Sequence, residues 1–166
     1  HYPMATGLRS LLSRADAPVV RAVDDISLRV EAGEVVGLVG ESGCGKSTTG
    51  RLLVGLEEPT AGVIRIDGVD ARALRASDRK AFHRRVQMIF QDPYAALNPQ
   101  HDTGEIVARP LVYQGVRDRA EIERRVRAAL VAVGLSPPEA WLSRYPHQLS
   151  GGQRQRVCVA RAIILE

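Results

Sequence analysis

A glycine-rich run between an apolar stretch and a helix-like stretch constrains this chain more than any other feature. Residues 40–47, GESGCGKS, fit the pattern G-x-x-x-x-G-K-[ST] in full. The preceding segment 35–40, VVGLVG, predicts a short strand buried on both faces, and leucines recur at helical spacing over 48–56. A strand, a glycine loop and a helix in this order predict a loop that holds a phosphate group at a helix N-terminus.

The residue types of this loop suit a nucleotide triphosphate. Glycines allow the main chain to curl its N–H groups inward, where a Cβ would obstruct the curl. Lys46 supplies a mobile positive charge for the β- and γ-phosphates, the Ser47 hydroxyl suits Mg²⁺, and Thr48 can reach the α-phosphate. The predicted contacts of this loop are Gly40, Ser42, Gly43, Cys44, Gly45, Lys46, Ser47 and Thr48.

Composition favours one ordinary globular domain and excludes several other classes of protein. The chain has 166 residues, of which 45% are hydrophobic and 25% charged, with a net charge of +4. A phosphate site and solubility explain this mild positive charge, and an aromatic content of 4% argues against stacking on single strands, so no nucleic-acid partner is expected. Two distant cysteines suggest neither zinc site nor disulfide framework and fit a reducing cytoplasm, and no apolar run approaches the ~20 residues that span a bilayer.

The apolar patterns predict strands mainly in the first half and helices in the second. Strands are expected over 23–30, 35–40, 63–68 and 85–91, the third followed by a turn. Helices are expected over 103–115, 118–134 and 153–165, with loops over 92–102 and 141–152. The fold class predicted is therefore α/β, a phosphate-loop core with a helical insert.

A second motif separates the classes of phosphate-loop protein. Residues 149–153 spell LSGGQ at the start of an apolar helix, and this resembles the signature of the ABC ATPases. Gln91 closes the stretch VQMIF and resembles the glutamine of that family's Q-loop. Tyr2 resembles the aromatic residue that stacks on adenine, and the segment between it and the next strand resembles an insertion found in one subgroup.

The resemblance implies a fold and a division of the chain. The fold is a P-loop NTPase (ABC ATPase) core with an antiparallel β subdomain and a helical subdomain, incomplete at the C-terminus. The phosphate-loop core and β subdomain would occupy 1–91, the Q-loop and helical subdomain 92–150, and the signature helix 149–166.

The resemblance also implies a shared site. Ser150 and the N–H groups of Gly151 and Gly152 would form a second anion site at a helix N-terminus, with Gln153 beside it. In a head-to-tail dimer, the phosphate loop of one subunit and the LSGGQ of the other would enclose each ATP. The implied catalytic residues are Lys46, Gln91 and Ser150, and the implied Mg²⁺ contacts are Ser47 and Gln91.

Several longer segments narrow the resemblance to one group of importers. GESGCGKST, MIFQDPYAALNP, EIVARPL and RYPHQLSGGQRQRV look like the ATPase subunits of bacterial oligopeptide and dipeptide importers, some of which move nickel or sugars. The implied partners are a second ATPase subunit, membrane permease subunits and, indirectly, a solute-binding protein. The implied location is the cytoplasmic face of the inner membrane.

Two alternatives remain open at this stage. A soluble ABC-class ATPase of DNA repair or translation would share both motifs, and the basic run 79–85 is its only support. A binding-only fragment is the other alternative, because both ends are interpreted as cut and no strand ending in Asp-Glu follows the signature helix. None of the four histidines (His1, His83, His101 and His147) stands where the family's switch histidine would, so this chain alone is expected to be inactive.

Overall fold

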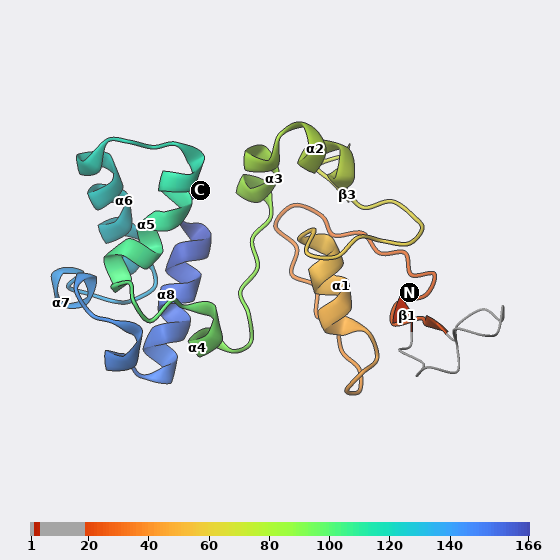
Figure 1. The fold of residues 1–166 in the computed structure, drawn as a ribbon, viewed down its shortest axis with the longest axis horizontal. Helices are drawn as coiled ribbons and strands as arrows, with labels where there is room; N and C mark the ends of the chain where they lie inside the picture. Colours follow the sequence, from red (N-terminus) through yellow and green to blue (C-terminus); the bar gives the residue numbers. More distant parts are fainter. Residues whose placement is uncertain (1, 4–18) are drawn as a thin grey trace, which may run out of the picture. The chain divides into compact units, whose positions relative to one another are not determined.

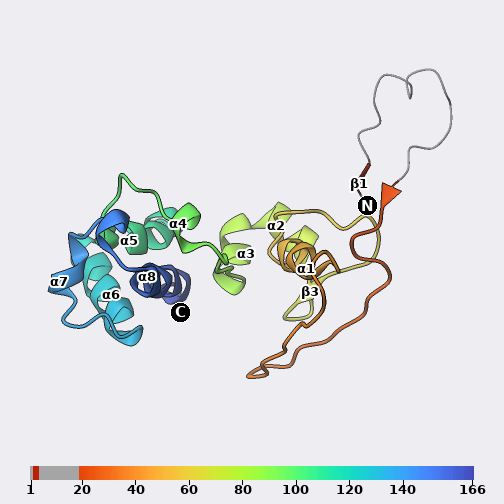
Figure 2. The same ribbon diagram turned by 90° about the horizontal axis from the view of Figure 1, so that it is seen from below.

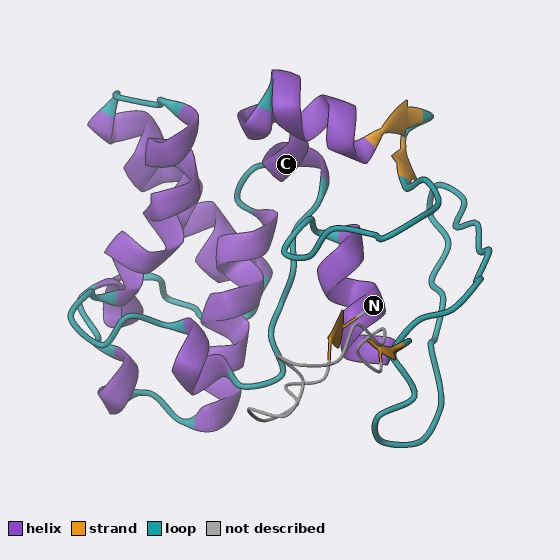
Figure 3. Ribbon diagram, turned by 45° about the vertical axis from the view of Figure 1, so that its right-hand side comes forward, coloured by secondary structure: helices purple, strands orange, loops and turns teal. Residues whose placement is uncertain are grey.

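The computed structural model describes residues 2–3 and 19–166. The chain divides into two compact units, His1–Ala73 and Leu74–Glu166 (Figure 1). Loops dominate the described part of the first unit and helices dominate the second (Figure 3). The two candidate motifs fall in different units, the phosphate loop in the first and LSGGQ in the second.

The described residues of the first unit form helix α1 (Lys46–Leu53) and two short antiparallel ladders. Strand β1 (Tyr2–Pro3) pairs with β2 (Val19–Val20), and β3 (Arg65–Ile66) pairs with β4 (Val69–Asp70). Helix α1 follows the glycine loop directly. Helix α2 (Ala71–Ser77) begins where β4 ends, and the Asp70 carboxylate accepts a hydrogen bond from the Ala73 N–H at 2.9 Å.

The β3–β4 hairpin forms where the sequence predicts a strand and a turn. Ile66 pairs with Val69, so only Asp67 and Gly68 remain in the loop. Both have positive φ, 51° and 76°, as a two-residue hairpin turn with the twist of its strands requires. Asp-Gly is a favoured pair for this turn, because aspartate tolerates and glycine freely adopts the left-handed region.

The strands predicted over 23–30, 35–40 and 85–91 are wrong for this structure. All three stretches lack strand structure, and the side chains of Val35 and Val39 are 96% and 94% exposed. Among the described residues the only strands are the four of the two ladders, and these pair only with one another. An extended segment becomes a strand only when a neighbour pairs with its N–H and C=O groups, and apolar periodicity does not supply that neighbour.

The same absence of pairing leaves a hollow in the first unit. An open cavity of about 1340 Å³ lies between residues 22–32 and the segments 48–53 and 57–68. Ile26 and Leu28 line it and remain half exposed. Their alternating pattern marks side chains suited to burial, but among the described residues they are only half covered.

The second unit is a helical bundle. Its long helices are α5 (Thr103–Gln114), α6 (Arg119–Ala132) and α8 (Gly151–Ile163), which pack against one another (Figure 2). The shorter elements are α3 (Arg79–Arg85), α4 (Pro93–Ala96), α7 (Glu139–Leu142) and the 3₁₀ turn η2 (Pro146–Gln148). The three long helices confirm the predicted helices to within two residues at each end; α4, α7 and η2 lie where only loops were predicted.

The bundle encloses one apolar core. Val107 and Leu111 of α5, Leu130 of α6 and Val157 of α8 are fully buried or nearly so. Each recurs on its helix at three- or four-residue spacing with other buried side chains, as the predicted amphipathic patterns require. The solvent face of α6 carries the expected i,i+4 ion pairs, among them Arg127 with Glu123 at 2.7 Å.

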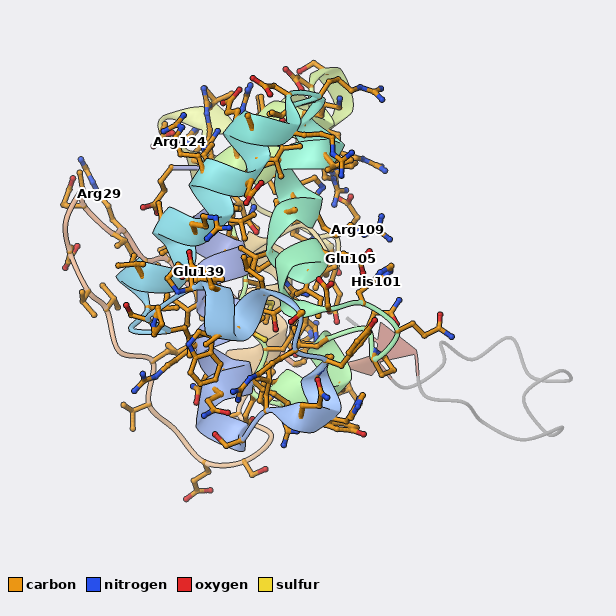
Figure 4. All side chains as sticks on the ribbon, turned by 90° about the vertical axis from the view of Figure 1, so that its left-hand side faces the viewer. Arg29, His101, Glu105, Arg109, Arg124 and Glu139 are labelled. Carbon is orange, nitrogen blue, oxygen red and sulfur yellow. The ribbon has the colours of Figure 1, made fainter. Side chains whose placement is uncertain are left out.

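Local hydrogen bonds fix the start of α5. The Asp102 carboxylate accepts from the Glu105 N–H at 2.8 Å, and the Glu105 carboxylate accepts from the Asp102 N–H at 3.2 Å, a reciprocal capping box. His101, Glu105 and Arg109 lie close together (Figure 4): the Nδ1 of His101 is 3.0 Å from the Glu105 carboxylate, and its Nε2 is 3.2 Å from the Arg109 guanidinium. The hydrogen bond from His101 lowers the pKa of Glu105.

Core burial predicts the cost of truncation. The substitution Leu130→Ala removes a fully buried side chain and should lower the free energy of unfolding of the second unit by about 2–5 kcal/mol. Val131→Ala is the matched control, since Val131 is 50% exposed and its loss should change stability by at most about 0.5 kcal/mol. Urea unfolding followed by the fluorescence of Trp141, the only tryptophan of the chain, measures both. Equal losses in the two variants would contradict this core.

Candidate functional site

The glycine loop adopts the curled main chain that its sequence predicts. Gly43 and Gly45 have φ of 84° and 88°, in the region that side chains rarely adopt. A Cβ on Gly45 would lie 2.0 Å from the carbonyl oxygen of Ala22, so no other residue fits there without displacing the backbone. Gly45 is also the residue from which α1 begins.

The Lys46 side chain folds back onto the start of the glycine loop. Its ammonium Nζ donates to the carbonyl oxygens of Gly40 and Glu41 at 2.7 and 2.8 Å, and it lies 3.6 Å from Cys44 Sγ. The lysine therefore bonds to the first residues of the loop while its own backbone starts the helix. A positive charge and a helix N-terminus thus meet at one point, which is the electrostatic environment that a phosphate group requires.

The first turn of α1 has the chemistry of an anion site. No side chain caps its N-terminus, and no acidic residue stands in its first turn. Ser47 is exposed there, and its hydroxyl is a hard oxygen donor of the kind that Mg²⁺ accepts. The residues present therefore fit both a triphosphate and its metal.

Thr49 is a structural residue of this site that the sequence patterns missed. Its side chain is buried, and its Oγ1 donates to the carbonyl oxygen of Gly45 at 2.8 Å. This bond fastens the first turn of α1 to the left-handed glycine. A threonine four residues after the last glycine of the motif is the only signal that could have indicated it.

The LSGGQ segment forms a capping box at the start of α8. Ser150 Oγ accepts from the Gln153 N–H at 3.3 Å, and Gln153 Oε1 accepts from the Ser150 N–H at 2.8 Å. Leu149 is buried in the core and anchors the turn. The sequence prediction that Ser150 caps a helix is confirmed, and Gln153 completes that cap.

The two glycines of this turn are not required by the fold of the chain itself. Gly151 and Gly152 are exposed, neither has positive φ, and a Cβ on either would meet no atom within 4 Å. This contrasts with Gly45, where steric clash and φ both demand glycine. The small residues at Gly151 and Gly152 therefore leave an open surface at a helix N-terminus.

The remaining predicted residues lie in different parts of the chain. Gln91 is exposed and directly precedes Asp92, whose carboxylate caps α4 by accepting from the Tyr94 N–H at 2.9 Å. Tyr2 lies in β1, opposite Val20, but its side chain is outside the described residues, as are His1 and the insertion that follows Pro3. His147 is exposed and stacks on Tyr145 with ring centroids 5.8 Å apart, which fits a packing role in its loop.

The basic run 79–85 forms α3, which contacts Tyr113 near the C-terminal end of α5. Phe82 is buried, His83 packs edge-on against Tyr113, and Lys80 lies over the same ring at 5.8 Å. Burial, with Arg79 and Arg75 nearby, lowers the pKa of His83. The run is thus a helix with one packed face, and its residues Arg79, Lys80, Arg84 and Arg85 are exposed.

Comparison with known proteins decides the family. The ABC transporter family model matches residues 23–166. The chain belongs to the ABC transporter family. The chain is 45% identical over 166 residues to a probable peptide ABC transporter ATP-binding protein of Sinorhizobium fredii, covering 100% of this chain and 45% of that protein. It is 46% identical over 164 residues to the glutathione import ATP-binding protein of Pectobacterium atrosepticum, covering 99% of this chain and 25% of that protein.

Solved structures confirm the α/β fold class of ABC ATP-binding domains. The dimeric structure of the ATP-binding cassette MJ0796 bound to ADP and Pi has a TM-score of 0.75 and 32% identity, over 86% of this chain and 61% of that one. CbiO1 of Clostridium perfringens has a TM-score of 0.74 and 28% identity, over 87% and 55%. The chain spans between a quarter and about half of the length of the two curated relatives. Within residues 2–3 and 19–166, no helix is long and apolar enough to cross a membrane.

The two cysteines of this ABC domain give an internal test of the phosphate loop. Cys44 is exposed in the loop, whereas Cys158 is buried in α8, where burial raises the pKa of its thiol and keeps it protonated. A thiol alkylator should label Cys44 first and Cys158 only on unfolding. Saturating Mg-ATP should slow the labelling of Cys44 at least about tenfold if phosphates occupy the loop. Peptide mass spectrometry measures both sites, and labelling of Cys44 that Mg-ATP leaves unchanged would contradict its placement.

Proposed function

We propose that the protein containing this chain is the ATP-binding subunit of an importer and hydrolyses ATP to drive uptake of peptides or similar solutes. The observation that carries the proposal is the curled glycine loop, closed by Lys46, at the start of α1. The names of the relatives, which include peptide and glutathione import ATP-binding proteins, support the class of cargo. The proposed regions are the phosphate-loop core over 1–91, the helical subdomain over 92–150 and the signature helix over 149–166.

The phosphate loop would hold the triphosphate by three kinds of contact. Main-chain N–H groups of the loop and of the first turn of α1 would donate to the β-phosphate. The Lys46 ammonium would exchange its bonds to Gly40 and Glu41 for the β- and γ-phosphate oxygens. Ser47 and Gln91 would hold Mg²⁺, Thr48 would reach the α-phosphate, and Tyr2 would stack on adenine.

A second copy of the domain would complete the site. Gly151 and Gly152 leave an open surface at the N-terminus of α8, although nothing inside the chain requires glycine there. This surface suits the γ-phosphate of a nucleotide held by the partner subunit, with Ser150 beside it. We therefore propose a head-to-tail dimer. In it, each ATP lies between the phosphate loop of one subunit and the signature turn (the LSGGQ segment, residues 149–153) of the other.

Hydrolysis in this arrangement is an in-line attack of water on the γ-phosphate. Mg²⁺, when bound, would neutralise part of the negative charge on the β- and γ-phosphates. Lys46 and the partner's signature turn would stabilise the charge that spreads over the transferring group. No group of residues 1–166 is assigned as the base, so we propose that this stretch by itself binds nucleotide with negligible turnover.

The partners follow from the same proposal. The segment after Gln91 and the helices up to Gly134 would dock a membrane permease subunit, which places the protein peripherally on the cytoplasmic face of the membrane. A solute-binding protein would select the cargo and act only through the permease.

Lys46 should be essential for turnover. In the full-length protein, Lys46→Ala removes the charge at the γ-phosphate and should lower the ATPase rate by roughly a hundredfold or more. Lys80→Ala, which changes the only other lysine of the chain, is the matched control and should hydrolyse ATP at the wild-type rate. A phosphate-release assay measures both, and full activity of the Lys46 variant would defeat the proposal.

Ser150 should separate nucleotide binding from dimer closure. A bulky cation in Ser150→Arg blocks the open surface of α8, so nucleotide binding should persist while the ATP-dependent dimer is lost. Ser143→Arg, at an exposed serine after α7, is the control. Equilibrium binding of a fluorescent nucleotide and light scattering report the two properties. A Ser150→Arg variant that still dimerises on adding ATP argues against the head-to-tail arrangement.

A further inference from the structure

Two arginines of α8 reach the same short helix, α4. Arg154 and Arg161 are seven residues apart, two helical turns, and therefore lie on one face of α8. The guanidinium of Arg154 lies over the ring of Tyr94, 5.1 Å from its centroid. Arg161 donates from Nη1 to the carbonyl oxygen of Ala96 at 2.8 Å. Both contacts join segments about sixty residues apart in sequence.

Arg154 is held in place from the signature side as well. Its backbone N–H donates to the carbonyl oxygen of Ser150 at 2.9 Å, and its Nη1 donates to that of Pro146 at 3.1 Å. Its Nε is buried and makes no hydrogen bond. Among the described residues no carboxylate forms an ion pair with it, so the ring of Tyr94 is its principal side-chain partner on α4.

The segment of α4 begins directly after Gln91 and is held by its own cap. Asp92 follows Gln91 and accepts from the N–H groups of Tyr94 and Ala95 at 2.9 and 3.4 Å. Leu97, at the other end of α4, is buried in the core of the bundle. Tyr94 itself is 61% exposed, so burial does not hold its ring, and the stack on Arg154 does.

We propose that Arg154 is a positioning residue, which, through Tyr94, makes the segment after Gln91 move as one body with the signature turn. The inference rests on the proposed function, in which Gln91 faces the nucleotide of its own chain and Ser150 faces the nucleotide of the partner subunit. The Tyr94–Arg154 contact would then couple the two nucleotides of a dimer through one chain. Loss of the contact should weaken that coupling and leave nucleotide affinity nearly intact.

The test compares single and double variants of the full-length protein in its dimer. Tyr94→Ala and Arg154→Ala should each lower kcat by roughly three- to tenfold and bring the Hill coefficient for ATP toward one. The Kd for a fluorescent ATP analogue should change less than about twofold. Because both act through one contact, the double variant should be no slower than the slower single variant. Tyr94→Phe keeps the ring face and should behave like the wild type.

Arg156→Ala is the matched control. Arg156 stands on the same helix and also donates to a backbone carbonyl, but that carbonyl belongs to Gly134, just after α6, and not to α4. Its loss should leave kcat and the Hill coefficient unchanged. An equal loss in the Arg156 variant would show that any arginine of α8 has this effect, and the inference would be overturned.

Other outcomes are equally decisive. Wild-type kcat and Hill coefficient in Tyr94→Ala, or a Hill coefficient of one in the wild type, would overturn the coupling. Should Arg154→Ala fail to fold by circular dichroism, the comparison of Tyr94→Ala with Tyr94→Phe decides alone. If Lys46→Ala keeps its ATPase turnover, the proposed function itself is defeated. If Lys46→Ala loses turnover while Tyr94→Ala keeps the wild-type kcat and Hill coefficient, only this inference is defeated.

Discussion

The hydrogen bonds from Lys46 to the carbonyl oxygens of Gly40 and Glu41 are the interactions on which the candidate site depends. They draw the two ends of the loop together, and the left-handed Gly45 lets α1 begin at that point. The Thr49 hydroxyl donates to the carbonyl oxygen of the same glycine and so stabilises the first turn of α1. A positive charge and a helix N-terminus therefore meet at one point, and each would be weak for phosphate binding without the other.

The signature turn uses glycine for a different reason. At Gly45 the chain itself excludes a side chain, whereas at Gly151 and Gly152 nothing within 4 Å would oppose one. The two hydrogen bonds of the capping box join Ser150 and Gln153 and involve neither glycine. Nothing within the described chain therefore requires glycine at these two positions, and the proposed dimer would give them a role toward the nucleotide of a second subunit.

The two units differ because their elements obtain burial in different ways. A helix satisfies its own backbone, so α5, α6 and α8 need only one another's apolar faces to form a core. A strand needs a neighbour for every residue, and the stretches around Val35 and Ile26 have none among the described residues. The helical unit is consequently well packed. The segment that precedes the phosphate loop, in contrast, leaves Val35, Val36 and Val39 exposed.

The sequence alone determined the motifs and the long helices, because both are local. G-x-x-x-x-G-K-[ST] specifies a loop conformation, LSGGQ specifies a capping box, and helical periodicity over 103–115 and 118–134 marks faces that must be buried. Only the tertiary structure decided the rest. It decided that 23–30, 35–40 and 85–91 are not strands, because pairing partners are distant in sequence. It likewise brought Arg154 onto Tyr94 and Arg161 onto Ala96, because no local pattern encodes which helix face meets a loop some sixty residues away.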